Sequence, residues 1–511
     1  MVRKSGYRFS EKTMLNEEAR AIDTVRTIGR TEAAGRNAIR GAFALALSSL
    51  LSGCLTTETV PGPDIDVPPK YRAAAVKPHA ALPAPDWWRG FRSRELTTLV
   101  ERAQLANLDI AAAVARIEQA DAQTRIAGAP LLPAINFDGV AQRARAGGAE
   151  SNRFSAVLNA SYEIDFWGKN RAALRSAEFT AVASRFDREV IVLSTVSTVI
   201  NTYFQVLAAQ DRLRIARSNV DAATRILKVY QDRIGVGTAS GLDIAQQESL
   251  VAQQRAAIPP LDQQLRQNIA ALAVLLGDAP ARVTVRGGSL TGIVAQRVSP
   301  GLPSDLLLQR PDIREAEVQL AAANANVESA RAALFPSISL TGSGGYVSTA
   351  LNTLFLPASA VYSVAGSLSQ PLFDGFRLLS QLDLQKGRRT ELLQLYRKAI
   401  LSGFGDVERA LIAVQDLAEQ ERLQTEAVAT ARRAYELSET QLRTGTIDIT
   451  TVLNTQRTLF AEQDQLVIVR LTRLQAIVSL FQAVGGGWVL PDEIASDRGR
   501  RAALRAKKDA R

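Results

Sequence analysis

Cysteine and histidine are almost absent from this sequence, with one of each in 511 residues. A single cysteine, Cys54, excludes a disulfide within the chain, and a single histidine, His79, excludes a site built from several imidazoles. The sequence also has no glycine-rich phosphate loop, no set of metal-ligating residues at the usual spacing and no serine–histidine–aspartate arrangement. We therefore expect neither an enzyme nor a metal site.

Proline is missing from two long stretches, between Pro133 and Pro259 and between Pro371 and Pro491. Glycine is also missing from residues 169–234, a stretch long enough for roughly 100 Å of helix at 1.5 Å per residue. A helix of that length must pack lengthwise against other helices. Residues 190–210 carry no charge, but their Ser, Thr, Asn and Gln favour a buried stretch of a long soluble helix over a transmembrane one.

Positive charge is concentrated at the two ends of the chain, which has a net charge of +10. Residues 1–53 contain nine Lys or Arg and five Asp or Glu, and residues 496–511 contain seven and two. The body between them is therefore close to neutral. We expect a basic, disordered tail over residues 491–511 and no binding of nucleic acid.

The N-terminal region has the features of an export signal. Arg36 and Arg40 precede an apolar run of about a dozen residues, which is too short to span a bilayer as a helix. The run ends in Leu51-Ser-Gly-Cys54, which resembles a bacterial lipobox. That resemblance implies cleavage before Cys54, attachment of lipid such as palmitate to this cysteine, and sorting to the outer membrane. The alternative is that Cys54 is a small buried hydrophobe.

Two segments follow from this interpretation. Residues 1–53 are predicted to be a long signal peptide, whose true start is either Met1 or Met14. Residues 54–85 are rich in proline and small residues, and are predicted to be a lipid-anchored tether. The covalent lipid on Cys54 is the only cofactor that we expect.

The body repeats one unit twice, a strand pair joined to a very long helical hairpin. Asn107-Leu-Asp-Ile110 and Pro133 in the first copy match Arg310-Pro-Asp-Ile313 and Pro336 in the second, at an offset of about 203. We predict a mixed α+β, mostly α fold with two tandem structural repeats, 86–300 and 301–490. The expected strands are at about 135–145, 153–165, 338–347 and 361–372, and the expected hairpins at about 168–276 and 376–484.

The four expected strands alternate between apolar and polar residues. In 154–164, for example, Phe154 and Leu158 fall on one face while Asn159 and Glu163 fall on the other. Each strand is about as long as a membrane-spanning β-strand. An open sheet edge in lipid leaves backbone groups unpaired, so the chain must oligomerise through this sheet. Three copies would supply twelve strands, but geometry alone does not select three over two or four.

Several motifs resemble those of the TolC-type outer-membrane efflux factors, and most of all the lipoprotein branch similar to OprM and NodT. Besides the lipobox, they are Trp87-Trp88, Tyr162-Glu-Ile-Asp-Phe-Trp-Gly168, Ile258-Pro-Pro-Leu261, Arg310-Pro-Asp-Ile313 and Ser369-Gln-Pro-Leu-Phe-Asp-Gly375. The resemblance covers roughly residues 54–490. It implies a homotrimer with a twelve-stranded transmembrane β-barrel continuous with a twelve-helix α-barrel. It also implies docking to a periplasmic adaptor and an inner-membrane pump.

The resemblance implies the function of a passive exit duct, in the outer membrane, of a tripartite efflux system of the RND multidrug type. The alternatives are the outer-membrane duct of a type I protein secretion system and a lipid-anchored periplasmic coiled-coil scaffold. The sequence does not identify the transported compound.

The hairpin tips are the candidate gating site. Gly237 and Gly445 can adopt positive φ at a tight turn, and should end the outgoing helices. By resemblance the tips form the periplasmic entrance, where family members commonly carry a ring of aspartates. The matching positions here, Thr451 and Asn454, are uncharged, which predicts weak binding of cations.

Three charged residues lie near the same tips. Asp448 either replaces the missing carboxylate in part or caps the returning helix. Arg457 matches an arginine of OprM-like members, and either pairs with a neighbouring tip or is solvated. In the first hairpin, Asp243 matches the position of Thr451 in the second. The two tips therefore differ in sequence and could gate unequally.

Overall fold

The computed structural model describes residues 62–72, 83–234, 240–296, 301 and 303–488. The chain divides into two units between Gly62 and Pro63, and the second unit, which holds the whole of the folded body, is described here. The expected signal peptide, the lipid site Cys54, the tip glycine Gly237 and the basic tail lie outside the described residues, as does part of the tether.

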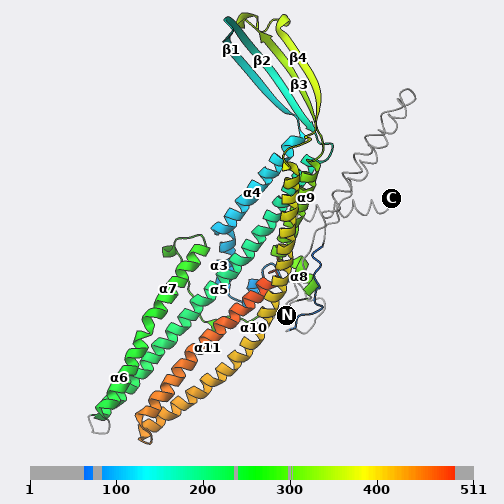
Figure 1. Cartoon of the computed structure of the whole chain (residues 1–511). Coiled ribbons are helices and arrows are strands. Elements are labelled where there is room, and N and C mark those ends of the chain that lie inside the picture. Colours follow the sequence, from blue (N-terminus) through cyan, green and yellow to red (C-terminus); the bar gives the residue numbers. More distant parts are fainter. Residues whose placement is uncertain (1–61, 73–82, 235–239, 297–300, 302, 489–511) are drawn as a thin grey trace, which may run out of the picture. The chain divides into compact units, whose positions relative to one another are not determined.

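The body is mostly helical and carries one small antiparallel sheet (Figure 1). Its first half contains η1 (Trp87–Phe91), α3 (Arg94–Ala106), α4 (Leu108–Gly128), β1 (Ala134–Ala146), β2 (Ala149–Ile164), α5 (Lys169–Ile234), α6 (Gly241–Ala256) and α7 (Ile258–Leu275). Its second half contains α8 (Pro303–Gln309), α9 (Pro311–Ala332), β3 (Ser337–Ser348), β4 (Ala360–Ser369), α10 (Arg377–Thr444) and α11 (Ile449–Ala483). Each half therefore places a strand pair between a short and a very long helix.

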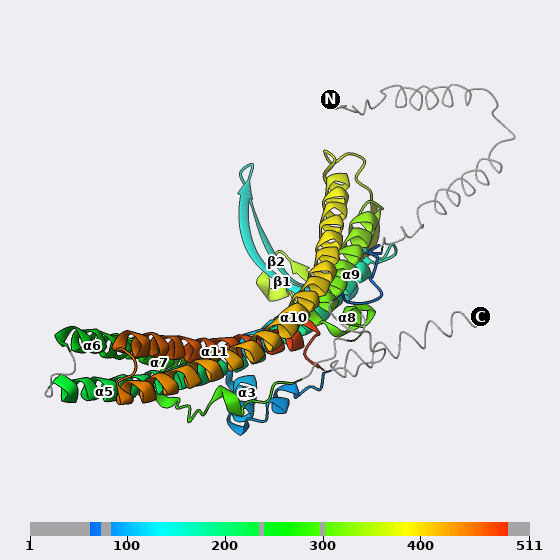
Figure 2. The same cartoon turned by 90° about the horizontal axis from the view of Figure 1, so that it is seen from below.

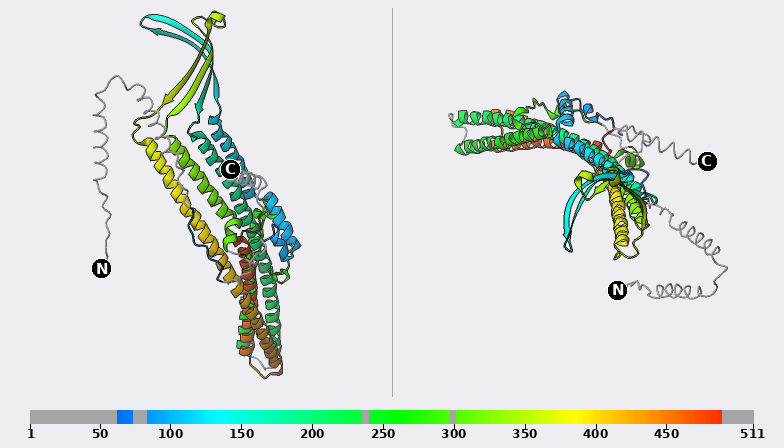
Figure 3. Two further views of the ribbon diagram at one scale, coloured as in Figure 1. Left: turned by 90° about the vertical axis from the view of Figure 1, so that its right-hand side faces the viewer. Right: turned by 90° about the horizontal axis from the view of Figure 1, so that it is seen from above.

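The two long helices, α5 and α10, have 66 and 68 residues. Both begin directly after the sheet (Figures 1 and 3), and their far ends turn back through α6 and α11 (Figures 1 and 2). Near the sheet the helices pack in the order α4–α5–α9–α10, which repeats the strand order β1–β2–β3–β4. Towards the tips α5 packs on α6, α7 and α11, and α11 packs on α10. The chain thus forms one continuous helical layer attached to one sheet.

Three apolar clusters hold this layer together. The largest surrounds the middle of α5, where Phe204 and Phe91 are completely buried with ring centroids 5.2 Å apart. Trp87 stacks on Phe481 of α11 at 4.4 Å, so the two tryptophans pack against the body, as their position after the tether suggests. The second cluster lies near the tips and joins α5, α6, α10 and α11, and the third joins α8, α10 and α11.

Among the residues that the structure describes, two helices, α5 and α11, are long and apolar enough to cross a membrane by length and composition alone. In each helix, 56% of the most apolar 18-residue stretch is buried inside the protein. This burial fits the interpretation that residues 190–210 are the core stretch of a long soluble helix.

Three boundaries differ from the sequence expectation. Strand β2 begins at Ala149 rather than near residue 153, because the turn that precedes it consists only of Gly147 and Gly148. Strand β4 ends at Ser369 rather than near residue 372, because Pro371 has no N–H to donate to a sheet. Pro259-Pro260 predicts a bend or gap in the returning arm of the first hairpin. Helix α6 ends at Ala256 and α7 begins at Ile258, so the gap is the single residue Ala257, just before the prolines. The prolines fall in the first turn of α7, where their missing N–H groups have no intrahelical partner to lose.

Candidate functional site

The sheet presents one apolar and one polar face. The register pairs Leu158 with Phe137 and with Gly344, and Leu340 with Tyr162 and with Gly366. Side chains of one face belong to alternate residues. The apolar face therefore carries Ile135, Phe137, Phe154, Leu158, Tyr162, Ile164, Ile338, Leu340, Tyr346, Tyr362, Val364 and Leu368. Such a face suits contact with lipid.

The opposite face of the sheet is held by polar pairs. The hydroxyl groups of Ser339 and Ser367 are 2.7 Å apart, and those of Ser343 and Ser363 are 2.8 Å apart. On the first strand pair, the Asn159 amide donates to Asp138 at 2.6 Å. Small and polar side chains thus satisfy one another across neighbouring strands, which suits a face in contact with water.

The second hairpin has a tight, capped tip. Gly445 has φ of +77° at the end of α10, a conformation that glycine adopts without a steric penalty. Asp448 then caps α11, because its carboxylate accepts from the Thr451 backbone N–H at 3.0 Å and from the Thr451 hydroxyl at 2.9 Å. These two hydrogen bonds hold the pKa of Asp448 below its usual value. The structure therefore shows the capping contact for Asp448.

The first hairpin tip has a different cap. The Ser240 hydroxyl accepts from the Asp243 N–H at 3.2 Å, and the Asp243 carboxylate accepts from the Ser240 N–H at 2.8 Å. This reciprocal pair is a capping box, which begins α6. Asp243 is consequently half-buried and engaged with its own helix.

The two tips are tied together by residues that the sequence did not single out. The guanidinium of Arg233, at the end of α5, donates to the backbone carbonyl of Leu442 and, at 3.4 Å, to that of Arg443. Arg233 thereby adds a side-chain donor to the last turn of α10, where the Leu442 carbonyl also accepts from the Gly445 backbone N–H at 3.0 Å. Backbone carbonyls have no signature in a sequence, so this contact could not be anticipated.

Tyr230 lies one turn before Arg233 and is almost completely buried. Burial raises the pKa of its phenol to about 12, with the charge of Arg233 acting against the shift and those of Asp243 and Asp448 adding to it. Nearby, the buried amide of Gln247 on α6 donates to the Ala223 carbonyl at 2.8 Å. Tyr230 and Gln247 are therefore polar groups inside the single apolar cluster that the two hairpins share near their tips.

Thr451, Asn454 and Arg457 are exposed on α11, one to three turns from its cap. Of the residues expected at the entrance, the structure brings Asp448 and Thr451 into direct contact, and it leaves Asn454 and Arg457 facing outwards. Within the described ranges, no group of three or more His, Cys, Asp or Glu lies close enough together to hold a metal ion.

Comparison with known proteins identifies the family. Residues 99–278 and 302–486 match the family described as outer membrane efflux protein. The chain is 41% identical over 460 residues to the pyoverdine export outer membrane protein OpmQ of Pseudomonas aeruginosa, covering 86% of this chain and 96% of that protein. It is 29% identical over 458 residues to the cation efflux system protein CusC of Escherichia coli, covering 87% and 98%.

The fold agrees with this relationship. The open state of the MtrE outer membrane channel of Neisseria gonorrhoeae superposes with a TM-score of 0.78 and 27% sequence identity, over 84% of this chain and 98% of that one. The apolar-faced sheet and the paired long hairpins have their counterparts in a family of channels. The chain belongs to the outer membrane efflux protein family, and it is an efflux channel of the outer membrane that extends into the periplasm.

Proposed function

We propose that three copies of this chain form one exit duct, with a twelve-stranded barrel in the outer membrane and a twelve-helix tunnel in the periplasm. The observation that carries the proposal is the four-stranded sheet, in which β1 and β4 each pair with one described strand only. Its apolar face requires lipid, and an open edge in lipid costs several kcal/mol for each unpaired backbone group. Pairing β1 of one copy with β4 of the next removes every open edge.

The helical layer supports the same assembly. Helix α10 lies at one edge of the layer and exposes Leu401, Ile412 and Leu423. Their spacing of 11 residues is about three helical turns, so the three side chains form one stripe along the helix. A stripe of large apolar residues pointing away from the rest of the chain suits contact with another copy.

The duct would receive its cargo from a periplasmic adaptor and an inner-membrane pump, at an entrance formed by the two hairpin tips. In this arrangement Asp448, Thr451, Asn454, Arg457 and Asp243 lie around the entrance, and a lipid on Cys54 anchors the chain. We propose no catalytic role for any residue. The names of the relatives concern pyoverdine and cations, which favours small molecules over secreted proteins as cargo.

Replacing two residues of the stripe tests the assembly. The double variant Leu401→Glu/Ile412→Glu should shift the purified protein from trimer to monomer, because it would place up to six carboxylates in apolar contacts of one trimer. The matched control is Ser402→Glu, which adds a charge at an exposed neighbouring position. Native mass spectrometry in detergent and heat-dependent migration in gels report the oligomer. A stable trimer in the double variant, or a monomer in the control, would contradict the proposed contact.

A further inference from the structure

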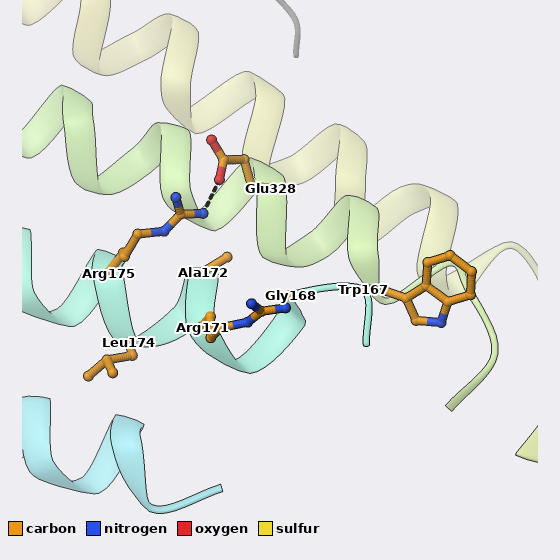
Figure 4. A pocket seen from close by; sticks show the side chains of 7 residues that line it. All are labelled: Trp167, Gly168, Arg171, Ala172, Leu174, Arg175 and Glu328. Atoms are coloured by element: carbon orange, nitrogen blue, oxygen red, sulfur yellow. Dashed lines mark hydrogen bonds and ion pairs between the residues drawn. The ribbon is translucent and has the colours of Figure 1, made fainter. Parts of the chain in front are cut away.

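A pocket lined by two arginines lies where the sheet meets the helical layer (Figure 4). It has a volume of about 470 Å³ and lies at the first two turns of α5, against α9. Its charged lining consists of Arg171 and Arg175 on α5 and Glu328 on α9. We propose that this pocket binds the phosphate headgroup of an anionic phospholipid from the periplasmic leaflet of the outer membrane. The inference rests on the proposed barrel, which sets the depth of this junction in the membrane.

The pocket opens on the side of the layer that continues the apolar face of the sheet. Lys169, at the start of α5, forms an ion pair with Glu163, which belongs to the polar face of β2. At about 100° per residue, Arg171 and Arg175 lie about 200° and about 240° around the helix from Lys169. They therefore project away from the polar side, towards the side where lipid would lie.

The walls of the pocket hold its guanidinium groups in place. The buried carboxylate of Asp165 accepts from the backbone N–H groups of Asn170 and Arg171 and from Nε of Arg171 at 3.0 Å. Arg175 forms an ion pair with Glu328, as the dashed line in Figure 4 shows. These contacts leave both side chains more than half exposed, at 62% for Arg171 and 53% for Arg175.

A rigid aromatic wall stands at the membrane end of the pocket. The Trp167 ring stacks on Phe335 with centroids 4.7 Å apart, and its indole N–H donates to the Pro336 carbonyl at 2.8 Å. Phe166 contacts the same indole edge-on and is 62% exposed. Exposed aromatic side chains next to a lipid-facing strand are typical of the membrane–water interface.

The chemistry of the pocket suits a phosphodiester. Arginine binds phosphate oxygens with paired N–H donors. Arg171 uses two of its five donors, since Nε bonds to the carboxylate of Asp165 and Nη2 donates to its backbone carbonyl at 2.9 Å, and Arg175 uses one of its five for Glu328. Each guanidinium group pairs with one carboxylate, Arg171 with the buried Asp165 and Arg175 with Glu328, so the pocket would hold a phosphate through the remaining N–H donors of the two arginines. A phospholipid whose phosphate occupied the pocket would have its acyl chains next to Phe166 and the apolar face of the sheet.

Two substitutions should change lipid binding in opposite directions. Arg175→Gln should weaken the binding of phosphatidylglycerol about fivefold, the effect expected for one basic residue near an anionic surface. Glu328→Gln should strengthen it by a similar factor, because it removes the competing carboxylate. The matched control is Arg217→Gln, which removes the same charge from an exposed position on α5 roughly 60 Å further from the membrane.

The measurement is native mass spectrometry of purified full-length trimers titrated with phosphatidylglycerol, phosphatidylethanolamine or inorganic phosphate. We expect phosphatidylglycerol to bind more tightly than phosphatidylethanolamine, and inorganic phosphate at the same concentration not to displace it. Equal binding of the two lipids, or equal losses in Arg175→Gln and Arg217→Gln, would overturn the inference. Displacement by phosphate alone would indicate a site for a free anion, and would overturn it too.

Failure of the site can be told from failure of the assembly. If Arg175→Gln does not form trimers, the increase in Glu328→Gln decides the result, since its absence contradicts the site. An unmodified protein that is monomeric in detergent would contradict the proposed duct and this inference together. An intact trimer without lipid preference would contradict this inference alone.

Discussion

The two long helices occupy matching places in the repeats but different environments. Helix α5 packs against α3, α4, α6, α7, α9 and α11, whereas α10 packs mainly against α9 and α11 at the edge of the layer. The completely buried Phe204 belongs to α5, while α10 exposes leucines such as Leu437 along much of its length. Duplication of a sequence therefore does not duplicate its surroundings. One helix became the centre of the chain, and the other kept a flank suited to a second copy.

The return arms differ in the same sense. The first is divided into α6 and α7, and the second is the single helix α11 of 35 residues. Helix α11 also contributes Phe481 and Ile477 to the main apolar cluster around α5. The second hairpin thus supplies part of the core of the first, and the two repeats cannot act as separate domains.

The largest effect should come from truncating a buried side chain of α5. Phe204→Ala should destabilise the fold by about 3–5 kcal/mol, because it removes a completely buried ring and leaves a cavity. Leu437→Ala, on the exposed side of α10, should cost less than about 1 kcal/mol. Loss of helical circular dichroism with urea, followed in detergent, compares the two. Similar midpoints for both variants would show that the two helices are equally buried in the assembled protein.

Much of the architecture could be predicted because it follows from composition and period. The stretch without Pro or Gly coincides with α5, and alternation between apolar and polar residues coincides with β2. The membership of the efflux family and the outer-membrane location are confirmed by the comparisons. These features depend on many residues at once, so a single departure does not hide them, as with the apolar Val157 on the otherwise polar face of β2.

The details of the tips could not be predicted in the same way. The bond of Arg233 to the Leu442 carbonyl joins a side chain to a backbone atom 209 residues away, and no residue type marks that partner. The capping contact of Asp448 was one of two interpretations, since an aspartate before a helix suits both a cap and a ring of carboxylates. The order of the helices and strands can be predicted from residue periodicity and from the positions of Pro and Gly. Long-range contacts of single side chains cannot, because they depend on how the helices pack.

Arg233 provides a second, smaller test, directed at the contact between the two hairpins. Arg233→Ala removes the donor to the last carbonyls of α10, so the tips should separate more readily and single-channel conductance in planar bilayers should rise. The matched control is Arg443→Ala, whose guanidinium pairs with Glu439 within α10 and does not join the hairpins. Unchanged conductance in Arg233→Ala, or an equal rise in Arg443→Ala, would show that this contact does not restrain the entrance.

The smallest effect concerns the caps, which are a serine in the first hairpin and an aspartate in the second. The pKa of Asp448 lies below its ordinary value of 3.8, because the Thr451 N–H and hydroxyl bind the charged form. The cap therefore stabilises α11 above about pH 4, and this contribution is lost as the pH falls through the lowered pKa. Hydrogen-exchange protection of the first turn of α11 should consequently decrease in acid, relative to the middle of the same helix.

Asp448→Ser gives the second hairpin the cap residue of the first, and should retain protection while removing its dependence on pH. If this variant lost protection in acid as the unmodified protein does, groups other than Asp448 would control the tip, and the difference between the two caps would have no consequence for pH.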